Sequence, residues 1–116
     1  MLKSYISEGL RRDEAQFDQY TAQKLADEFY FWATHQGAEL DLLLIKNGRR
    51  VGVEVKFADA PKLTPSMRIA LVDLNLERLW VIYPGALRYA LAPRVVAVPA
   101  AVLADRGAMQ IWRAEK

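Results

Sequence analysis

The feature that most constrains this chain is an Asn-Gly pair, Asn47-Gly48, set between two apolar segments, ELDLLLIK (Glu39 to Lys46) and RVGVEVKF (Arg50 to Phe57). Asn-Gly is the strongest short-range signal for a β-hairpin, because both residues tolerate the positive φ angles of a two-residue type I′ turn. Such a turn pairs Lys46 with Arg49, and every further pair of opposite residues then has numbers with the same sum. The sequence therefore predicts the register of the hairpin as well as its existence.

Applied along the ladder, this register sets Asp41 opposite Glu54 and Glu39 opposite Lys56. Opposite residues share a face of the sheet, with Cβ atoms about 4.5–5.5 Å apart. A hairpin loop one residue longer would shift the pairing and break this arrangement.

The apolar residues of the first strand alternate between the two faces. Leu40, Leu42 and Leu44 are expected on one face, and Leu43 and Ile45 on the other. Because both faces are apolar, we expect the sheet to be covered on both sides.

Two opposed carboxylates repel each other, and partial burial adds a desolvation cost. A cation or a shared proton relieves the repulsion, and Lys56 lies on the same face two residues from Glu54. Mg²⁺, or Mn²⁺ in its place, suits Asp41 and Glu54 as ligands, with a backbone carbonyl near Val55 to complete the set. The metal would activate water for phosphodiester hydrolysis, and Lys56 would stabilise the developing negative charge. The alternative is a surface salt-bridge ladder with a Glu39–Lys56 ion pair.

The other segments predict an α/β (α+β) fold in which helices flank a mixed central sheet. Thr64 as N-cap and Pro65 at the first helical position open a helix with an inner stripe at positions 67, 70, 71 and 74. The remaining predicted elements are a first helix (Asp13 to Ala26), strands at 28–34, 78–85, 88–91 and 94–98, a short helix from Pro99 and an edge strand at 109–112.

With 116 residues the chain is predicted to be one domain, residues 1–116, with residues 1–12 as an irregular or weakly helical lead-in. The formal net charge of +2 is too small to indicate nucleic-acid binding by itself. The absence of cysteine excludes disulfides and thiolate metal sites. Without a signal peptide or a spanning apolar run, the expectation is a cytoplasmic protein with no membrane association. The long apolar strands favour a homodimer in which a second subunit covers a sheet edge.

These motifs together resemble the PD-(D/E)XK nuclease superfamily, and more narrowly the C-terminal domain of unknown function attached to a group of prokaryotic AAA-type ATPases. The resemblance implies a restriction-endonuclease-like core with the order α-β-β-β-α-β and C-terminal additions. The matching stretches are F-Y-F-W-A-T (29–34), G-A-E-L-D (37–41), E-V-K (54–56), Pro84-Gly85 and Val98-Pro99.

In that superfamily the aspartate and glutamate of the motif bind metal and the lysine is catalytic, which implies these roles for Asp41, Glu54 and Lys56. The first helix often carries a further acid, and Asp18 stands in that place, one methylene shorter than the usual glutamate. Ala33 occupies a position where relatives commonly have arginine.

Three functions follow as hypotheses. The first is a Mg²⁺-dependent nuclease acting on DNA. The second is a catalytically silent module of the same fold, which binds DNA or regulates an AAA-type ATPase partner. The third is a structural oligomerisation domain. The single histidine, His35, is expected in an exposed turn.

Overall fold

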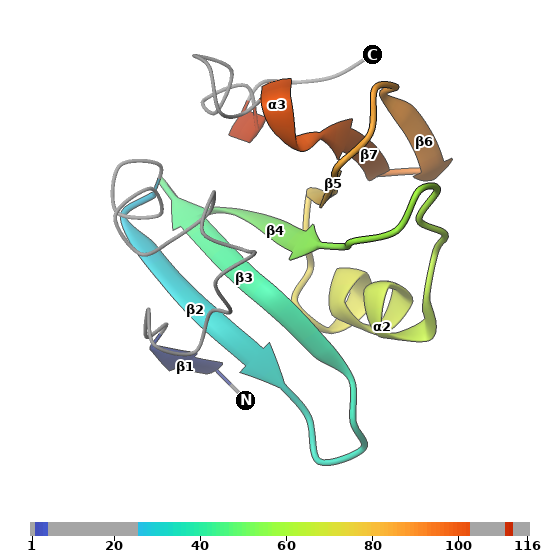
Figure 1. The fold of residues 1–116 in the computed structure, drawn as a ribbon. Helices are drawn as coiled ribbons and strands as arrows, with labels where there is room; N and C mark the ends of the chain where they lie inside the picture. Colours follow the sequence, from blue (N-terminus) through green and yellow to red (C-terminus); the bar gives the residue numbers. More distant parts are fainter. Residues whose placement is uncertain (1, 5–25, 103–110, 113–116) are drawn as a thin grey trace.

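The computed structural model describes residues 2–4, 26–102 and 111–112. These residues form a mixed α+β fold around a seven-stranded sheet of order β1-β2-β3-β4-β5-β7-β6 (Figure 1). The elements are β1 (Leu2–Ser4), β2 (Glu28–Ala33), β3 (Glu39–Lys46), β4 (Arg49–Val55), α2 (Pro65–Asp73), β5 (Arg78–Tyr83), β6 (Tyr89–Ala92), β7 (Val95–Pro99) and α3 (Ala100–Val102).

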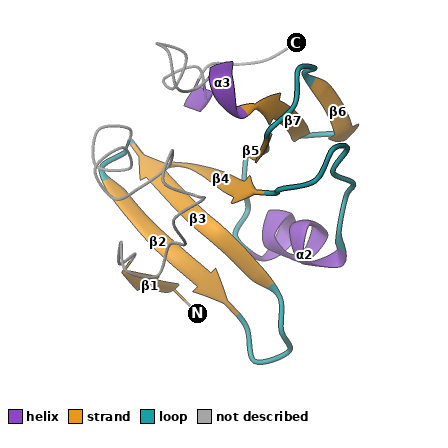
Figure 2. Ribbon diagram, in the orientation of Figure 1, coloured by secondary structure: helices purple, strands orange, loops and turns teal. Residues whose placement is uncertain are grey.

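Neighbouring strands change from antiparallel to parallel pairing at the centre of the sheet. Strands β1 to β4 are antiparallel neighbours, β4, β5 and β7 run parallel, and β6 returns antiparallel to β7. The parallel pairing of β4 with β5 requires a crossover, which α2 provides (Figure 2). No helix in these ranges is long and apolar enough to cross a bilayer.

Both faces of the sheet are covered, as the alternation of apolar residues predicts. On one face, α2 contributes Met67, Ala70 and Leu71, and its C-cap contributes Leu74, to a core that includes Leu43 and Leu79. On the other face, Ile111 and Trp112 pack with Leu42, Leu44, Trp80 and Ile82. The candidate residues of β3 and β4 therefore lie inside a sheet with two buried sides.

The predicted hairpin register is confirmed. Asn47 and Gly48 have φ angles of 53° and 79°, as a type I′ turn requires. Lys46 pairs with Arg49, and the same register continues to the pair Leu42 and Val53.

The prediction that Leu40 lies on the same face of the sheet as Leu42 and Leu44 is wrong. The pairing of β2 with β3 slips by one residue between Tyr30↔Leu43 and Trp32↔Leu40, so the β3 residues at 41 and 42 share one partner position on β2. This β-bulge reverses the alternation beyond it, and Leu40 is buried with Leu43 on the α2 side rather than with Leu42.

The start of α2 was predicted to the residue. Thr64 is the N-cap, its hydroxyl accepts a hydrogen bond from the Met67 N–H at 3.2 Å, and Pro65 occupies the first turn. The predicted inner stripe is buried. Strand β4 is shorter than predicted and ends at Val55, beyond which the Lys56 N–H donates to the carbonyl of Ile82 at 2.8 Å.

The two ends of the chain differ from the prediction where they are described. Leu2–Ser4 forms a strand on β2 rather than an irregular lead-in. Most of the predicted helix from Asp13 lies outside the described residues, and Ala26 at its end is not helical. Ile111 and Trp112 form a 3₁₀ turn instead of an edge strand.

Gly52 on β4 serves close packing rather than a ligand. A Cβ atom at this position would lie 2.8 Å from Leu76 Cδ1, 2.9 Å from Leu79 Cδ1 and 3.2 Å from Leu40 Cδ2. All three leucines are at most 1% exposed, so their side chains have little room to move.

We therefore expect Gly52→Ala to lower the free energy of unfolding by about 1–2 kcal/mol, as overpacking of a filled core does. Urea denaturation followed by circular dichroism measures this. Unchanged stability in Gly52→Ala would show that the core accommodates the methyl group.

Candidate functional site

The candidate site lies where the β3–β4 ladder ends. Past the pair Leu42 and Val53, each strand supplies a carboxylate that binds a backbone N–H of the other strand. Glu54 Oε1 accepts from the Asp41 N–H at 3.1 Å, and Asp41 Oδ2 accepts from the Val55 N–H at 2.8 Å. These two reciprocal bonds hold Asp41 and Glu54 together, although the paired residues of the ladder end at Leu42 and Val53, before the predicted pair of Asp41 and Glu54.

The lysine of the motif joins this pair. Lys56 Nζ lies 3.3 Å from Glu54 Oε2, and the lysine side chain remains partly exposed. The spacing of two residues, which places both side chains on one face, was sufficient to predict this contact. The structure thus brings Asp41, Glu54 and Lys56 together.

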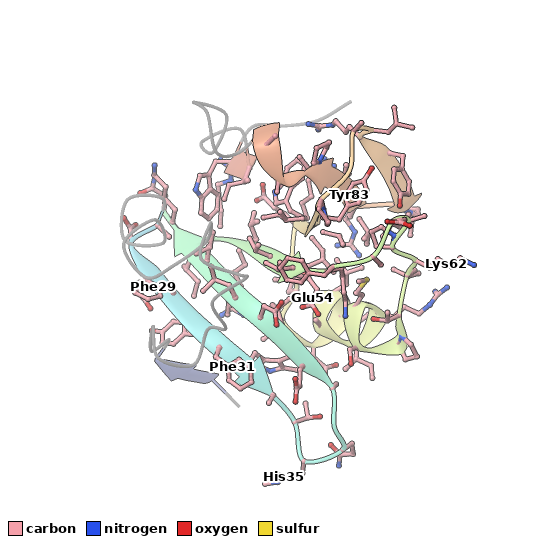
Figure 3. The ribbon with its side chains drawn as sticks, viewed as in Figure 1. Phe29, Phe31, His35, Glu54, Lys62 and Tyr83 are labelled. Atoms are coloured by element: carbon pink, nitrogen blue, oxygen red, sulfur yellow. The ribbon has the colours of Figure 1, made fainter. Side chains whose placement is uncertain are left out.

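Glu54 is buried, at 8% exposure, the one charged or polar residue so buried among those described. Its pKa is raised to about 7, first because burial disfavours the charged form and second because of the negative charge of Asp41. The Asp41 N–H and Lys56 act in the opposite direction without overcoming these effects. Near neutral pH, Glu54 can therefore carry or release a proton. Figure 3 shows its position between the hairpin and α2.

The bulge in β3 explains how Asp41 reaches its partner. The slip in register occurs between Leu40 and Leu43, directly at Asp41. Bulges commonly re-aim a side chain beside a functional site, and here the carboxylate of Asp41 meets the Val55 N–H. Sequence reasoning missed this bond, because it depends on pairing with β2 and has no local signal.

The other predicted residues stand apart from this cluster. Glu39 is exposed, pairs with Ala33 of β2, and its N–H donates to Ser66 Oγ at 3.4 Å. Within the described residues Lys56 forms its ion pair with Glu54, so the Glu39–Lys56 pair is wrong. Asp18 lies outside the described residues.

Two further predictions concern Val55 and His35. A backbone carbonyl near Val55 was predicted as a metal ligand, which stays a prediction; the structure shows the Val55 N–H donating to Asp41. His35 is exposed at the tip of the β2–β3 turn, away from Glu54, as predicted (Figure 3).

The chemistry of the pair suits a hard cation. Carboxylate oxygens are the preferred protein ligands of Mg²⁺, which uses one or two carboxylates and keeps several waters. A divalent ion would also offset the repulsion that raises the pKa of Glu54. Across residues 26–102 and 111–112 no group of three or more His, Cys, Asp or Glu side chains is placed to hold a metal, so the donor set from this part of the chain is two carboxylates.

With this geometry established, the chain can be compared with known proteins. A family model described as "Domain of unknown function (DUF4143)" matches residues 14–103. This chain belongs to the DUF4143 family. The matched residues contain the whole hairpin and its carboxylate pair, so the site lies within the DUF4143 domain.

Similar sequences occur in two mycobacterial proteins. Uncharacterized proteins of Mycobacterium bovis and Mycobacterium tuberculosis are each 44% identical to this chain over 92 residues, which is 79% of the chain. The chain spans only 21% of the length of each relative. No solved structure gives a significant match.

Proposed function

We propose that this DUF4143 chain is a Mg²⁺-dependent nuclease domain of the PD-(D/E)XK type that hydrolyses DNA phosphodiester bonds. The observation that carries the proposal is the arrangement of Glu54, buried with a pKa of about 7, against Asp41 and within 3.3 Å of Lys56. Perturbed carboxylates beside a specific charge partner are concentrated at functional sites.

The order of elements supports the same proposal. The described residues run β2-β3-β4-α2-β5, with β4 and β5 parallel, which corresponds to the β-β-β-α-β part of the restriction-endonuclease-like order. In that superfamily the acids lie on the second and third strands of this series, where Asp41 and Glu54 lie here.

Asp41 and Glu54 would hold the metal, which when bound would polarise the phosphate and lower the pKa of a bound water. Lys56 lies beside Glu54 and is partly exposed, so its ammonium group can reach a phosphate oxygen and stabilise the developing charge. The reciprocal backbone bonds fix both carboxylates before any ligand arrives, and such preorganisation favours catalysis.

The test is calorimetric titration of Mg²⁺ and Mn²⁺ into wild type and Asp41→Asn at pH 8, where Glu54 is largely ionised, with plasmid nicking assayed on the same samples. We expect millimolar or tighter binding and nicking by wild type, and loss of both in Asp41→Asn. Asparagine keeps an oxygen for the Val55 N–H, so the fold should persist. Glu39→Gln, which removes an exposed acid outside the cluster, is the matched control and should behave as wild type.

Metal binding that Asp41→Asn leaves intact would contradict the assignment of the site. Nicking that persists in the variant would point to a contaminating nuclease.

A second candidate is a catalytically silent module of this fold that binds or regulates an AAA-type ATPase. One observation favours it: the carboxylate pair already has partners without a metal, in two backbone N–H groups and Lys56. The match covers only 21% of the length of each mycobacterial relative, and the rest of each relative leaves room for a partner domain. Absence of metal binding at millimolar concentrations would favour this candidate.

A further inference from the structure

A concave feature lies near the β6 edge of the sheet, formed by β5, β7, β6 and the turns beside them. It is a cavity of about 360 Å³ lined by three arginines, Arg78, Arg88 and Arg94, together with Tyr89, Ala90 and Val96. Arg78 begins β5, and Arg94 immediately precedes β7. The cavity is therefore associated with the amino ends of the parallel strands, whereas Glu54 and Lys56 lie at the carboxyl end of β4.

The strand register explains why the surface is hollow here. Trp80 of β5 pairs with Val96 of β7, and Val96 pairs with Ala90 of β6. This row becomes smaller towards the edge of the sheet, from an indole to a single methyl group. Alternation places Arg78 on the face of Trp80, and Arg88 on the face of Ala90. Arg78 therefore lies at the Trp80 end of this row of side chains, and Arg88 lies at the Ala90 end, where the side chains are smallest.

Stacking on Trp80 fixes two of the guanidinium groups. The Cζ atoms of Arg78 and Arg88 lie 5.5 and 5.2 Å from the centroid of the Trp80 ring, within the distance of a cation–π interaction. Trp80 is only 1% exposed, so the ring is a rigid support. The guanidinium group is planar, and its N–H groups form a rigid fork that matches the oxygens of a phosphate.

The third arginine is positioned by the backbone. Arg94 has a φ of 69° in the β6–β7 turn, a conformation that is uncommon for residues other than glycine. One of its N–H groups donates to the Leu76 carbonyl at 2.8 Å. This bond anchors the guanidinium beside the cavity and uses one of the five donors that arginine carries.

The described lining contains three positive charges and no carboxylate. Glu77, next to Arg78 in the chain, is not part of this lining. Its pKa is lowered first by the hydrogen bond from Arg49, whose Nε lies 3.1 Å from Glu77 Oε1, and further by the charges of Arg49 and Arg78. A tetrahedral oxyanion accepts hydrogen bonds from several guanidinium groups at once, and arginine is the side chain best suited to bind phosphate in this manner.

We propose that this arginine cavity binds the phosphate group of a phosphate ester. A volume of about 360 Å³ falls in the range of small-ligand sites, roughly 300–1,000 Å³, and exceeds what a bare phosphate ion needs. The ester belongs either to a free nucleotide or to the backbone of a nucleic-acid strand, and both present the same anion to the arginines. The inference does not depend on the nuclease proposal, because the cavity shares no residue with the carboxylate site.

The test is calorimetric titration of the 116-residue chain, without divalent metal, with adenosine 5′-monophosphate, with adenosine, and with a single-stranded oligonucleotide. We expect the monophosphate to bind and adenosine not to bind. Arg78→Gln and Arg88→Gln are each expected to weaken binding by about tenfold or more, which is the effect of losing a charge-assisted hydrogen bond. Arg68→Gln removes the same charge from an exposed position on α2 and should leave binding unchanged.

The oligonucleotide distinguishes the two sources of the ester. If it binds much more tightly than the monophosphate and loses that advantage in Arg78→Gln, the ligand is a nucleic-acid backbone; if the monophosphate binds at least as tightly, the ligand is a free nucleotide. Arg78→Lys, which keeps the charge and loses the fork, provides a second variant should Arg78→Gln fail to fold by circular dichroism. Equal weakening by Arg68→Gln, or no binding of either phosphate probe at millimolar concentrations, would overturn the proposal.

Discussion

At pH 8, Glu54→Gln is expected to raise the free energy of unfolding of the metal-free chain by about 3 kcal/mol, since each pKa unit corresponds to about 1.4 kcal/mol. The carboxyl of Glu54 has a pKa of about 7 in the folded chain, against an ordinary value of 4.5. Burial and the charge of Asp41 both make the ionised form costly, and glutamine removes that charge. Its amide oxygen can still accept the hydrogen bond from the Asp41 N–H.

The same shift determines how wild-type stability depends on pH. Below about pH 4.5 the folded and unfolded states both hold the proton on Glu54. Between about 4.5 and 7 the folded state retains the proton that the unfolded state has released, so stability falls as the pH rises and levels off above 7. At pH 5 the advantage of Glu54→Gln should therefore shrink to about 1 kcal/mol or less.

Urea denaturation of both proteins at pH 5 and pH 8 measures these differences. Glu39→Gln, at an exposed position on β3, should show no comparable change between the two pH values. A clear loss of stability in Glu54→Gln at pH 8 would contradict the role of charge repulsion.

Trp80→Ala is expected to lower the free energy of unfolding by about 3–5 kcal/mol, the usual cost of removing a large buried aromatic side chain. Trp80 is 1% exposed and lies in the core on the face opposite α2. Its Nε1–H donates to the Ile111 carbonyl at 3.1 Å, so the substitution also removes a hydrogen bond between β5 and Ile111.

Chemical denaturation measures this cost, and Trp80→Phe separates its parts. Phenylalanine keeps a buried ring and loses the hydrogen bond, which should cost about 1–2 kcal/mol. If the two variants were equally stable, burial of the ring would not be the main contribution of Trp80.

The parts of the fold with strong local signals were predictable. Asn47-Gly48 determines a turn with positive φ angles, and the register of β3 against β4 follows from the length of that turn. Thr64 and Pro65 similarly determine where α2 begins. The contact of Asp41 with Glu54 was predicted from the hairpin register, whereas the bond from the Val55 N–H to Asp41 depends also on the bulge that pairing with β2 produces.

The features that sequence reasoning missed depend on contacts distant in the chain. The bulge that turns Leu40 to the α2 side arises from the pairing of β2 with β3, and no turn residue marks it. The burial of Ile111 and Trp112 against the sheet has no local signal either. The arginine cavity requires the order in which β5, β7 and β6 lie side by side, which alternation along one strand does not reveal.

The two-residue turn has a consequence for how the chemistry of this chain is encoded. Asp41 and Glu54 are 13 residues apart, and closing a short loop costs little conformational entropy compared with joining distant segments. The three arginines of the cavity likewise come from one stretch, Arg78 to Arg94. The two segments do not overlap, so each set of charged groups can change during evolution while the other keeps its residues, within one shared core.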